Sequence, residues 1–178
     1  MKKYLVQFKP FLIFIGTFFS AYILLTLLYK LYLNGFAATD VDGITNVVGR
    51  NVEQVMKMFN CDIQIRKSCF YTHLEVWYNK KFTIRIVEGC NAISVIILFI
   101  SFIIAFSGKF KTTLLFILAG SLLIYILNVA RIALLTILLY RFPENEHILH
   151  GVVFPLIIYG LVFILWIFWV NKFSKYAK

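Results

Sequence analysis

The sequence predicts an all-α membrane protein: a bundle of four transmembrane helices with a small external α+β segment between the first and second helices. Three observations predict this class. Hydrophobic residues make up 61% of the 178 residues and the mean hydropathy is +0.85, well above the values of a soluble domain. Four apolar stretches are long enough to cross a bilayer, which takes about 20 residues. The formal net charge is +10, and much of it lies at the ends of these stretches.

This composition excludes several classes of protein. A disordered chain has low hydrophobicity. A soluble nucleic-acid-binding domain carries its basic residues on a polar surface, so we expect no nucleic-acid partner. Three cysteines are too few for a disulfide scaffold. The lipid bilayer is therefore the first predicted partner.

The predicted spans divide the chain into four parts. The spans cover residues 11–33, 92–107, 112–140 and 148–170. The apolar core of the first span is longer than that of a signal peptide, so we expect an uncleaved anchor. The parts are an N-terminal anchor helix (1–33), an extracytoplasmic segment (34–89), a three-helix core (90–170) and a basic cytoplasmic tail (171–178).

The distribution of charge predicts the orientation. Eight lysines and no acidic residue flank the spans on one side: Lys2, Lys3, Lys9, Lys109, Lys111, Lys172, Lys175 and Lys178. On the other side, residues 34–89 hold seven basic and six acidic residues, and residues 141–147 hold one basic and two acidic. The positive-inside rule then places both termini in the cytoplasm and both polar loops outside.

Two further basic residues lie within the spans. Lys30 is near the outer end of the first span, where its side chain can reach the interface. Arg131 lies deep in the third span, where a charge costs about 2.5–3.5 kcal/mol even on the most lenient scale. Arg131 therefore either marks a functional site or pairs with a neighbouring helix as a packing contact.

Helical rise places Arg131 at the same depth as a cysteine and a histidine. Counted from the cytoplasmic lysine that flanks each span, Cys90, Arg131 and His150 lie about 28, 30 and 33 Å outward. Because the hydrocarbon core is about 30 Å thick, all three reach the outer interface, on three different helices. Beyond Arg131, the third span either continues outward for about two turns or tilts strongly.

These three side chains suit acyl transfer through a thioester. Cys90 begins the second span, and a helix N-terminus or a nearby cation favours the nucleophilic thiolate. His150 begins the fourth span and can act as an acid or a base, although His147 lies one turn earlier. Arg131 can hold a carbonyl or an oxyanion. Each residue also has a structural alternative, such as a small buried cysteine or an interfacial histidine.

The order of these residues resembles a family signature. Glu88-Gly89-Cys90, then Asn128-Val129-Ala130-Arg131, then His150 resemble the exosortase/archaeosortase pattern, which covers roughly residues 85–170. In that pattern an acidic residue stands two before a Cys at the start of a membrane helix, followed by N-x-x-R in a later helix and a His at the start of the next. The FPLIIYG run after His150 and the chain's length most resemble the short F-type exosortases of Bacteroidetes.

The resemblance implies a membrane-embedded cysteine transpeptidase or protease of the bacterial inner membrane, with its active site facing the periplasm. Such enzymes cleave C-terminal sorting signals of exported proteins, each a short motif, a membrane helix and a basic tail. They pass the new C-terminus to a cell-envelope acceptor. The core at 90–170 would then be the catalytic part.

Site residues are carried over by position. Cys90 would be the nucleophile, Arg131 the carbonyl or oxyanion partner and His150 the proton shuttle. Glu88 would orient Arg131 or His150, and Asn128, one helical turn from Arg131, would orient the guanidinium or the substrate. The family implies no cofactor. We also predict no metal, because Cys61, Cys69, His73 and His147 lack the spacing of zinc ligands.

The chain departs from the family pattern in ways that leave alternatives open. Asn91-Ala92 stands where the family commonly has Ser-Gly, and many members have about eight spans. The H-x-x-x-G spacing of many relatives fits His147 and Gly151, whereas the F-type pattern favours His150. The sorting motif, the acceptor and the oligomeric state stay open. The alternatives to an enzyme are a non-catalytic membrane scaffold or assembly subunit and a small transporter component.

The sequence pattern of the segment at residues 34–89 predicts an amphipathic helix and a β-hairpin. Apolar residues recur every three or four positions over residues 40–59, although Gly43 and Gly49 weaken a helix there. Residues 70–78 and 82–87 are rich in aromatic and β-branched side chains on either side of a turn at Asn79-Lys80-Lys81. The edge of this hairpin either receives an extended substrate peptide or caps the helix bundle. Cys61 and Cys69 could pair or stay reduced.

Overall fold

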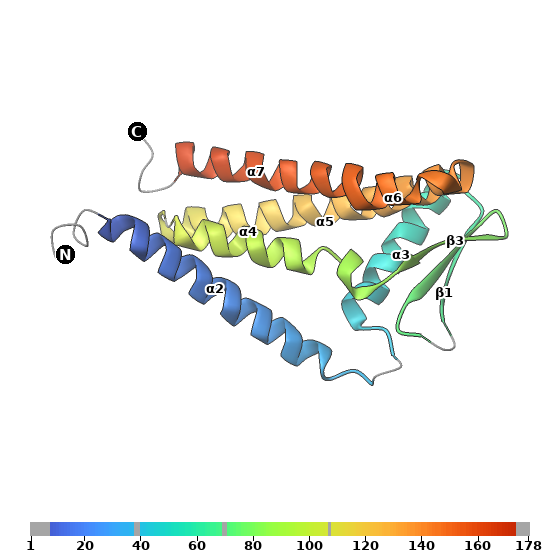
Figure 1. Ribbon diagram of the computed structural model, residues 1–178, viewed down its shortest axis with the longest axis horizontal. Coiled ribbons are helices and arrows are strands. Elements are labelled where there is room, and N and C mark those ends of the chain that lie inside the picture. Colours follow the sequence, from blue (N-terminus) through green and yellow to red (C-terminus); the bar gives the residue numbers. More distant parts are fainter. Residues whose placement is uncertain (1–7, 38–39, 69–70, 107, 174–178) are drawn as a thin grey trace.

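The computed structural model describes residues 8–37, 40–68, 71–106 and 108–173. It is mostly helical, with a small sheet at one end of an elongated bundle (Figure 1). The long bundle helices are α2 (Lys9–Leu33), α4 (Ile93–Ala105), α5 (Phe110–Arg141) and α7 (Phe154–Lys172). The start of α2 and the end of α7 lie at the end of the bundle opposite the sheet (Figure 1).

Within the described residues, three helices are long and apolar enough to cross a membrane: Lys9–Leu33, Phe110–Arg141 and Pro143–Lys172. The last is a continuous run made of a short turn η2 (Pro143–Asn145), α6 (Glu146–Ile148), η3 (Leu149–Val153) and α7. The sequence predicts a fourth span at 92–107, but α4 has only 13 residues and measures about 20 Å. It begins one residue later than predicted, after Ala92 in a left-handed conformation, and it ends at Ala105.

The bundle packs through aromatic side chains. Phe99 and Trp169 are fully buried between α4, α5 and α7, and Gly120 on α5 makes room for the Phe99 ring. A Cβ added at Gly120 would lie 2.4 Å from Phe99 Cζ, so only glycine fits here. The indole of Trp169 donates to the Phe106 carbonyl (3.0 Å) and fastens α7 to the end of α4.

Helix α2 is attached to this bundle along one side only. None of its 25 residues is buried, and Phe14 packs on Phe102 and Phe106 with ring centroids 5.9 and 4.5 Å apart. Further along the chain α2 diverges from α4 (Figure 1). Its apolar surface is what a helix exposed to lipid requires.

Helix α5 continues past Arg131 as one unbroken helix to Arg141. Its 32 residues measure about 48 Å. The outer part does not turn away: Leu135 and Leu139 are buried in a core shared with Val76 and Ile84 of the sheet. Helix α3 and the sheet therefore pack directly on the last third of α5.

The predicted amphipathic helix is confirmed as α3 (Gly43–Met58). It begins at Asp42, whose carboxylate accepts a hydrogen bond from the Thr45 N–H (2.9 Å), a standard N-cap. Gly49 faces β2, where an added Cβ would lie 2.4 Å from Leu74 Cδ1. Phe59, which the periodicity placed on the apolar face, is 77% exposed because the helix ends before it.

The sheet has three antiparallel strands in the order β1-β2-β3. They are β1 (Ile63–Lys67), β2 (Leu74–Tyr78) and β3 (Lys81–Ile86). The predicted hairpin is β2–β3, and its turn residues Asn79 and Lys80 have φ values of 48° and 62°, as in a type I′ turn. The sequence analysis missed β1, although Ile63 and Ile65 alternate with polar residues.

Candidate active site

Cys90 lies in the turn that joins β3 to α4. The turn is a short 3₁₀ helix, η1 (Glu88–Cys90), in which the Cys90 N–H donates to the Val87 carbonyl (2.8 Å). The side chain is largely buried, with 8% of the residue exposed. Two residues later, Ala92 has φ 67°, a left-handed conformation that residues with a Cβ rarely adopt. The chain thus bends sharply beside the thiol before α4 begins at Ile93.

Asn91 holds this turn against two other helices. Its Oδ1 accepts from the Ile93 N–H (3.0 Å) at the start of α4. Its Nδ2 donates to the hydroxyl of Tyr29 on α2 (2.7 Å) and to that of Thr45 on α3 (3.3 Å). The asparagine that replaces the family's serine is therefore a buried structural residue, a role that the sequence pattern did not predict.

Asn128 contacts the cysteine directly. It is buried on α5, and its Nδ2 donates to the carbonyl oxygen of Cys90 (2.7 Å). The sequence predicts that Asn128 orients the Arg131 guanidinium or the substrate. The observed bond instead ties the backbone of Cys90 to α5, one helical turn from Arg131.

Cys90, Arg131 and His150 line the same cavity, which has a volume of about 190 Å³. The three residues come from the turn after β3, from α5 and from η3, so their proximity depends on the tertiary fold. The rest of the lining comes from β3, from the outer turns of α5 and from one acidic residue: Phe82, Thr83, Ile84, Arg85, Ile86, Ile132, Leu135, Leu139 and Glu146. A nucleophile, a cation and an imidazole thus meet at one opening.

Arg131 presents an unused donor. Its Nε is buried, and no acceptor bonds it within the described part of the chain. A buried N–H without an acceptor costs about 1–3 kcal/mol. Arg131 therefore keeps a hydrogen-bond donor for which the described residues supply no acceptor.

The chain matches the family model described as Transmembrane exosortase (Exosortase_EpsH) over residues 4–170. The match includes the cavity, the sheet and most of the bundle. The chain belongs to the exosortase family. Members are membrane proteins known in general as cysteine transpeptidases that act on sorting signals. No curated protein and no solved structure matched the chain.

In this exosortase the two histidines have different positions. Both are exposed, but His150 lines the cavity, whereas His147, on α6, is not among the described residues that line it. His150 lies in η3, a single π-helical turn, and such turns occur frequently at functional sites. The sequence pattern did not predict this π turn.

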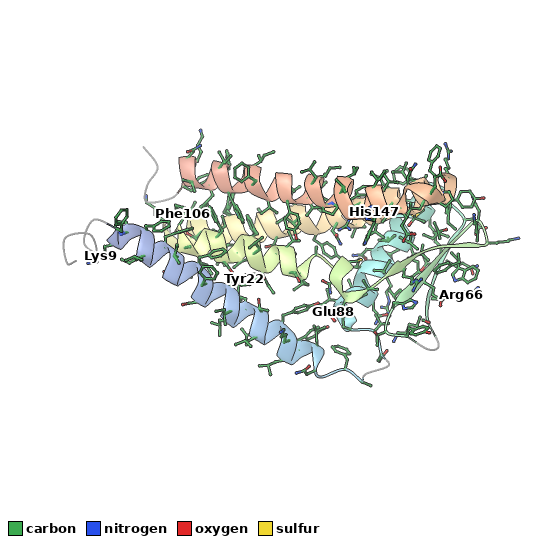
Figure 2. The ribbon with its side chains drawn as sticks, viewed as in Figure 1. Lys9, Tyr22, Arg66, Glu88, Phe106 and His147 are labelled. Atoms are coloured by element: carbon green, nitrogen blue, oxygen red, sulfur yellow. The ribbon has the colours of Figure 1, made fainter. Side chains whose placement is uncertain are left out.

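Glu88 lies at a second cavity. That cavity is lined by Asp40, Asp42 and the residues that follow α2, and Figure 2 shows Glu88 on the side of the turn that faces α2. Nearby, the Lys67 ammonium donates to Asp40 (2.8 Å) and holds the pKa of that carboxyl below its usual value. Glu88 does not line the cavity of Cys90 within the described residues.

The acidic residue at the exosortase cavity is instead Glu146. It precedes His150 by four residues, a spacing that places two side chains on neighbouring positions of a helix face. The sequence analysis missed Glu146, although this i, i+4 spacing with His150 was visible.

The remaining cysteine and histidine predictions concern the external segment. Cys61 and Cys90 are free thiols. Cys69, the other cysteine of the predicted pair, lies outside the described residues. His73 stacks on Tyr71 with ring centroids 5.6 Å apart. Within the described ranges, no group of three or more potential metal ligands occurs.

Proposed function

We propose that this exosortase is a transpeptidase that cleaves C-terminal sorting signals of exported proteins through a thioester on Cys90. It would pass the new C-terminus to an acceptor in the cell envelope. The observation that carries the proposal is the single cavity lined by Cys90, Arg131 and His150. A non-catalytic scaffold or a transporter component has no need for a cavity lined by a thiol, a guanidinium and an imidazole.

The proposed reaction has two acyl transfers. His150 accepts the thiol proton, and Cys90 Sγ attacks the carbonyl carbon of the scissile peptide bond. Arg131 donates hydrogen bonds to the oxyanion that forms. The C–N bond then breaks, His150 gives its proton to the leaving amine, and a thioester remains on Cys90.

The second transfer returns the enzyme to its starting state. The nucleophile of the acceptor attacks the thioester carbonyl and gives its proton to His150. The C–S bond breaks, and the sulfur leaves as a thiolate that His150 reprotonates. Where water is the acceptor, the same steps make the enzyme a protease. No step needs a metal or a cofactor.

Other residues support these groups in the proposal. Asn128 fixes the Cys90 backbone through its bond to the carbonyl oxygen. Glu146 orients the His150 imidazole from the preceding turn of helix. Glu88 influences the position of Cys90 through the 3₁₀ turn that both residues belong to, and it does not contact Arg131 or His150.

The proposed setting is the bacterial inner membrane. The lysine clusters support both termini in the cytoplasm, and the sheet then lies outside with the cavity open to the periplasm. We propose that α4 is embedded beside α2, so that four helices contact the bilayer. The FPLIIYG run after His150 supports the F-type subgroup.

The decisive experiment follows processing of a co-expressed exported protein whose C-terminus has a short motif, an apolar helix and a basic tail. Cys90→Ser, Arg131→Ala and His150→Ala should each reduce processing by about 100-fold or more. His147→Ala is the matched control and should process at nearly the original rate. Each variant is quantified in the membrane fraction by immunoblot.

Two outcomes would contradict parts of the proposal. Unchanged processing by Cys90→Ser would refute the enzymatic function and favour a scaffold or transporter component. Loss of processing in His147→Ala with full processing in His150→Ala would exchange the roles of the two histidines.

A further inference from the structure

The strand β3 lies at the edge of the sheet, beside the cavity. The described strands are ordered β1-β2-β3, so β3 has a neighbouring strand on one side only. Five successive residues of this segment, Phe82 to Ile86, line the cavity. Successive side chains of a strand point to opposite faces, so five in a row can border one cavity only if the cavity runs along the strand's edge.

The register shows which backbone groups point toward this edge. The Asn79 N–H donates to Asp62 (2.8 Å) and the His73 carbonyl accepts from Ser68 (3.1 Å), so these residues of the β2 hairpin arm turn toward β1. Backbone N–H and C=O groups alternate in direction along a strand, so those of Glu75 and Trp77 also point toward β1.

Their partners across the hairpin are Arg85 and Phe82. Because Glu75 and Trp77 direct their backbone groups to β1, the N–H and C=O groups of Arg85 and Phe82 point away from β2. Between them, Thr83 has no partner in the register and forms a bulge. Bulges of this kind are common at sheet edges and beside active sites.

The part of α5 that lines the opposite side of the cavity is about as long as the part of β3 that lines it. From Phe82 to Ile86 the strand extends about 13 Å. From Arg131 to Leu139 helix α5 extends about 12 Å, and Leu135 lies between them on the same wall. The cavity is therefore a groove between the edge of β3 and the leucines of α5, and Cys90 is among the residues that line it.

We propose that the sorting signal binds in this groove as an added parallel β-strand, paired with β3 through the residues that precede its scissile bond. This proposal rests on the proposed function and describes how the substrate reaches Cys90. Main-chain pairing would hold any extended segment in place, and the leucines would contact its side chains.

The parallel direction follows from the order of segments. A sorting signal runs from the exported domain, through the motif, into its membrane helix. In this chain β3 leads to Cys90 and then to α4, which also enters the bundle (Figure 1). A substrate that runs in the same direction places its upstream residues beside β3, its scissile bond at Cys90 and its helix beside the bundle.

The first test removes one outward N–H. Arg85→Pro deletes the donor and adds a ring at the edge, whereas the matched variant Arg85→Ala changes the side chain only. Edge strands tolerate proline at outward positions. Processing of the co-expressed tailed protein should fall about tenfold or more in Arg85→Pro relative to Arg85→Ala.

A control on the far edge of the sheet accounts for general effects of proline. Lys67 on β1 pairs with Leu74, so its backbone also points away from β2. The Lys67→Pro and Lys67→Ala enzymes should process the co-expressed tailed protein to the same extent. Equal processing by Arg85→Pro and Arg85→Ala, with Cys90→Ser inactive, would overturn the strand pairing and leave the proposed function intact.

The second test does not depend on proline. The photoreactive residue p-benzoylphenylalanine is placed at Phe82, at Arg85 or at Arg66 on β1, in Cys90→Ala enzyme with the tailed protein co-expressed. Position 85 should crosslink close to the scissile bond and position 82 farther upstream, with no crosslink from position 66. The reverse order would overturn the parallel direction, and no crosslink from 82 or 85 would overturn the docking site.

Discussion

Ala92 stands at the tightest bend of the site. Its φ of 67° is left-handed, which costs a residue with a Cβ about 1–2 kcal/mol. The buried side chain of Asn91 holds the bend, with bonds to α2, α3 and the start of α4. The fold thus keeps Cys90 at a strained turn, which sets the direction in which its side chain leaves the backbone.

Glycine at this position should relieve the strain. We expect Ala92→Gly to raise the free energy of unfolding by up to about 1 kcal/mol, because the flexibility gained by the unfolded chain offsets part of the relief. Ala119 in helix α5 is the control, where Ala119→Gly should lower it by about 1 kcal/mol. Thermal unfolding in detergent measures both, and equal losses in the two variants would contradict the assignment of strain to Ala92.

The site shows what residue patterns can and cannot predict. Cys90, Arg131 and His150 were selected because helical rise puts them at one depth, and the fold brings them to one cavity. Glu146 could have been found from its i, i+4 spacing with His150, whereas the position of Glu88 was not predictable in this way. It depends on the 3₁₀ turn before α4, which has no regular period in the sequence.

At the scale of elements, α4 and α5 approach closely at one point. Phe99 is fully buried there, and a Cβ on Gly120 would lie 2.4 and 2.7 Å from two atoms of its ring. The helices can keep their present separation only while residue 120 has no side chain. This contact lies in the bundle, away from the cavity of Cys90.

A methyl group at this contact should therefore separate the helices. We expect Gly120→Ala to lower the free energy of unfolding by about 1–3 kcal/mol through overpacking. Gly160→Ala on α7 is the matched control, since an added Cβ there meets nothing within 4 Å. It should raise stability by up to about 1 kcal/mol through helix propensity. A thermal shift assay in detergent distinguishes the two, and a neutral Gly120→Ala would show that Phe99 can move aside.

Elements with a clear hydrophobic period were predicted well, and short or interrupted ones were not. The long apolar runs of α2, α5 and α7 and the amphipathic period of α3 needed no tertiary information. Helix α4 begins later than its apolar run predicts, because Asn91 and Ala92 form the turn that carries Cys90. The five residues of β1 are too short a pattern to stand out before their pairing with β2 is known.

At the scale of the molecule, α5 joins two structures. Its inner part packs with α4 and α7, and its outer third forms a common core with α3 and the sheet (Figure 1). The candidate site lies between these two packed regions. Any rotation of the external part relative to the bundle would change the distance from Cys90 to Arg131.

The proposed orientation can be tested on the whole molecule. In enzyme with its native cysteines replaced by serine, Asn79→Cys in the hairpin turn should react with a membrane-impermeant maleimide in intact spheroplasts. Lys109→Cys, between α4 and α5, should react only after the membrane is permeabilised. The opposite labelling pattern would invert the topology and place the cavity on the cytoplasmic side.

An unpaired sheet edge usually invites association between molecules. Here the edge of β3 borders a cavity whose other side is formed by α5, so α5 covers part of that edge. In the proposed binding mode, an exported protein would have to hold its folded body away from the membrane on an extended linker before its tail could reach the thiol.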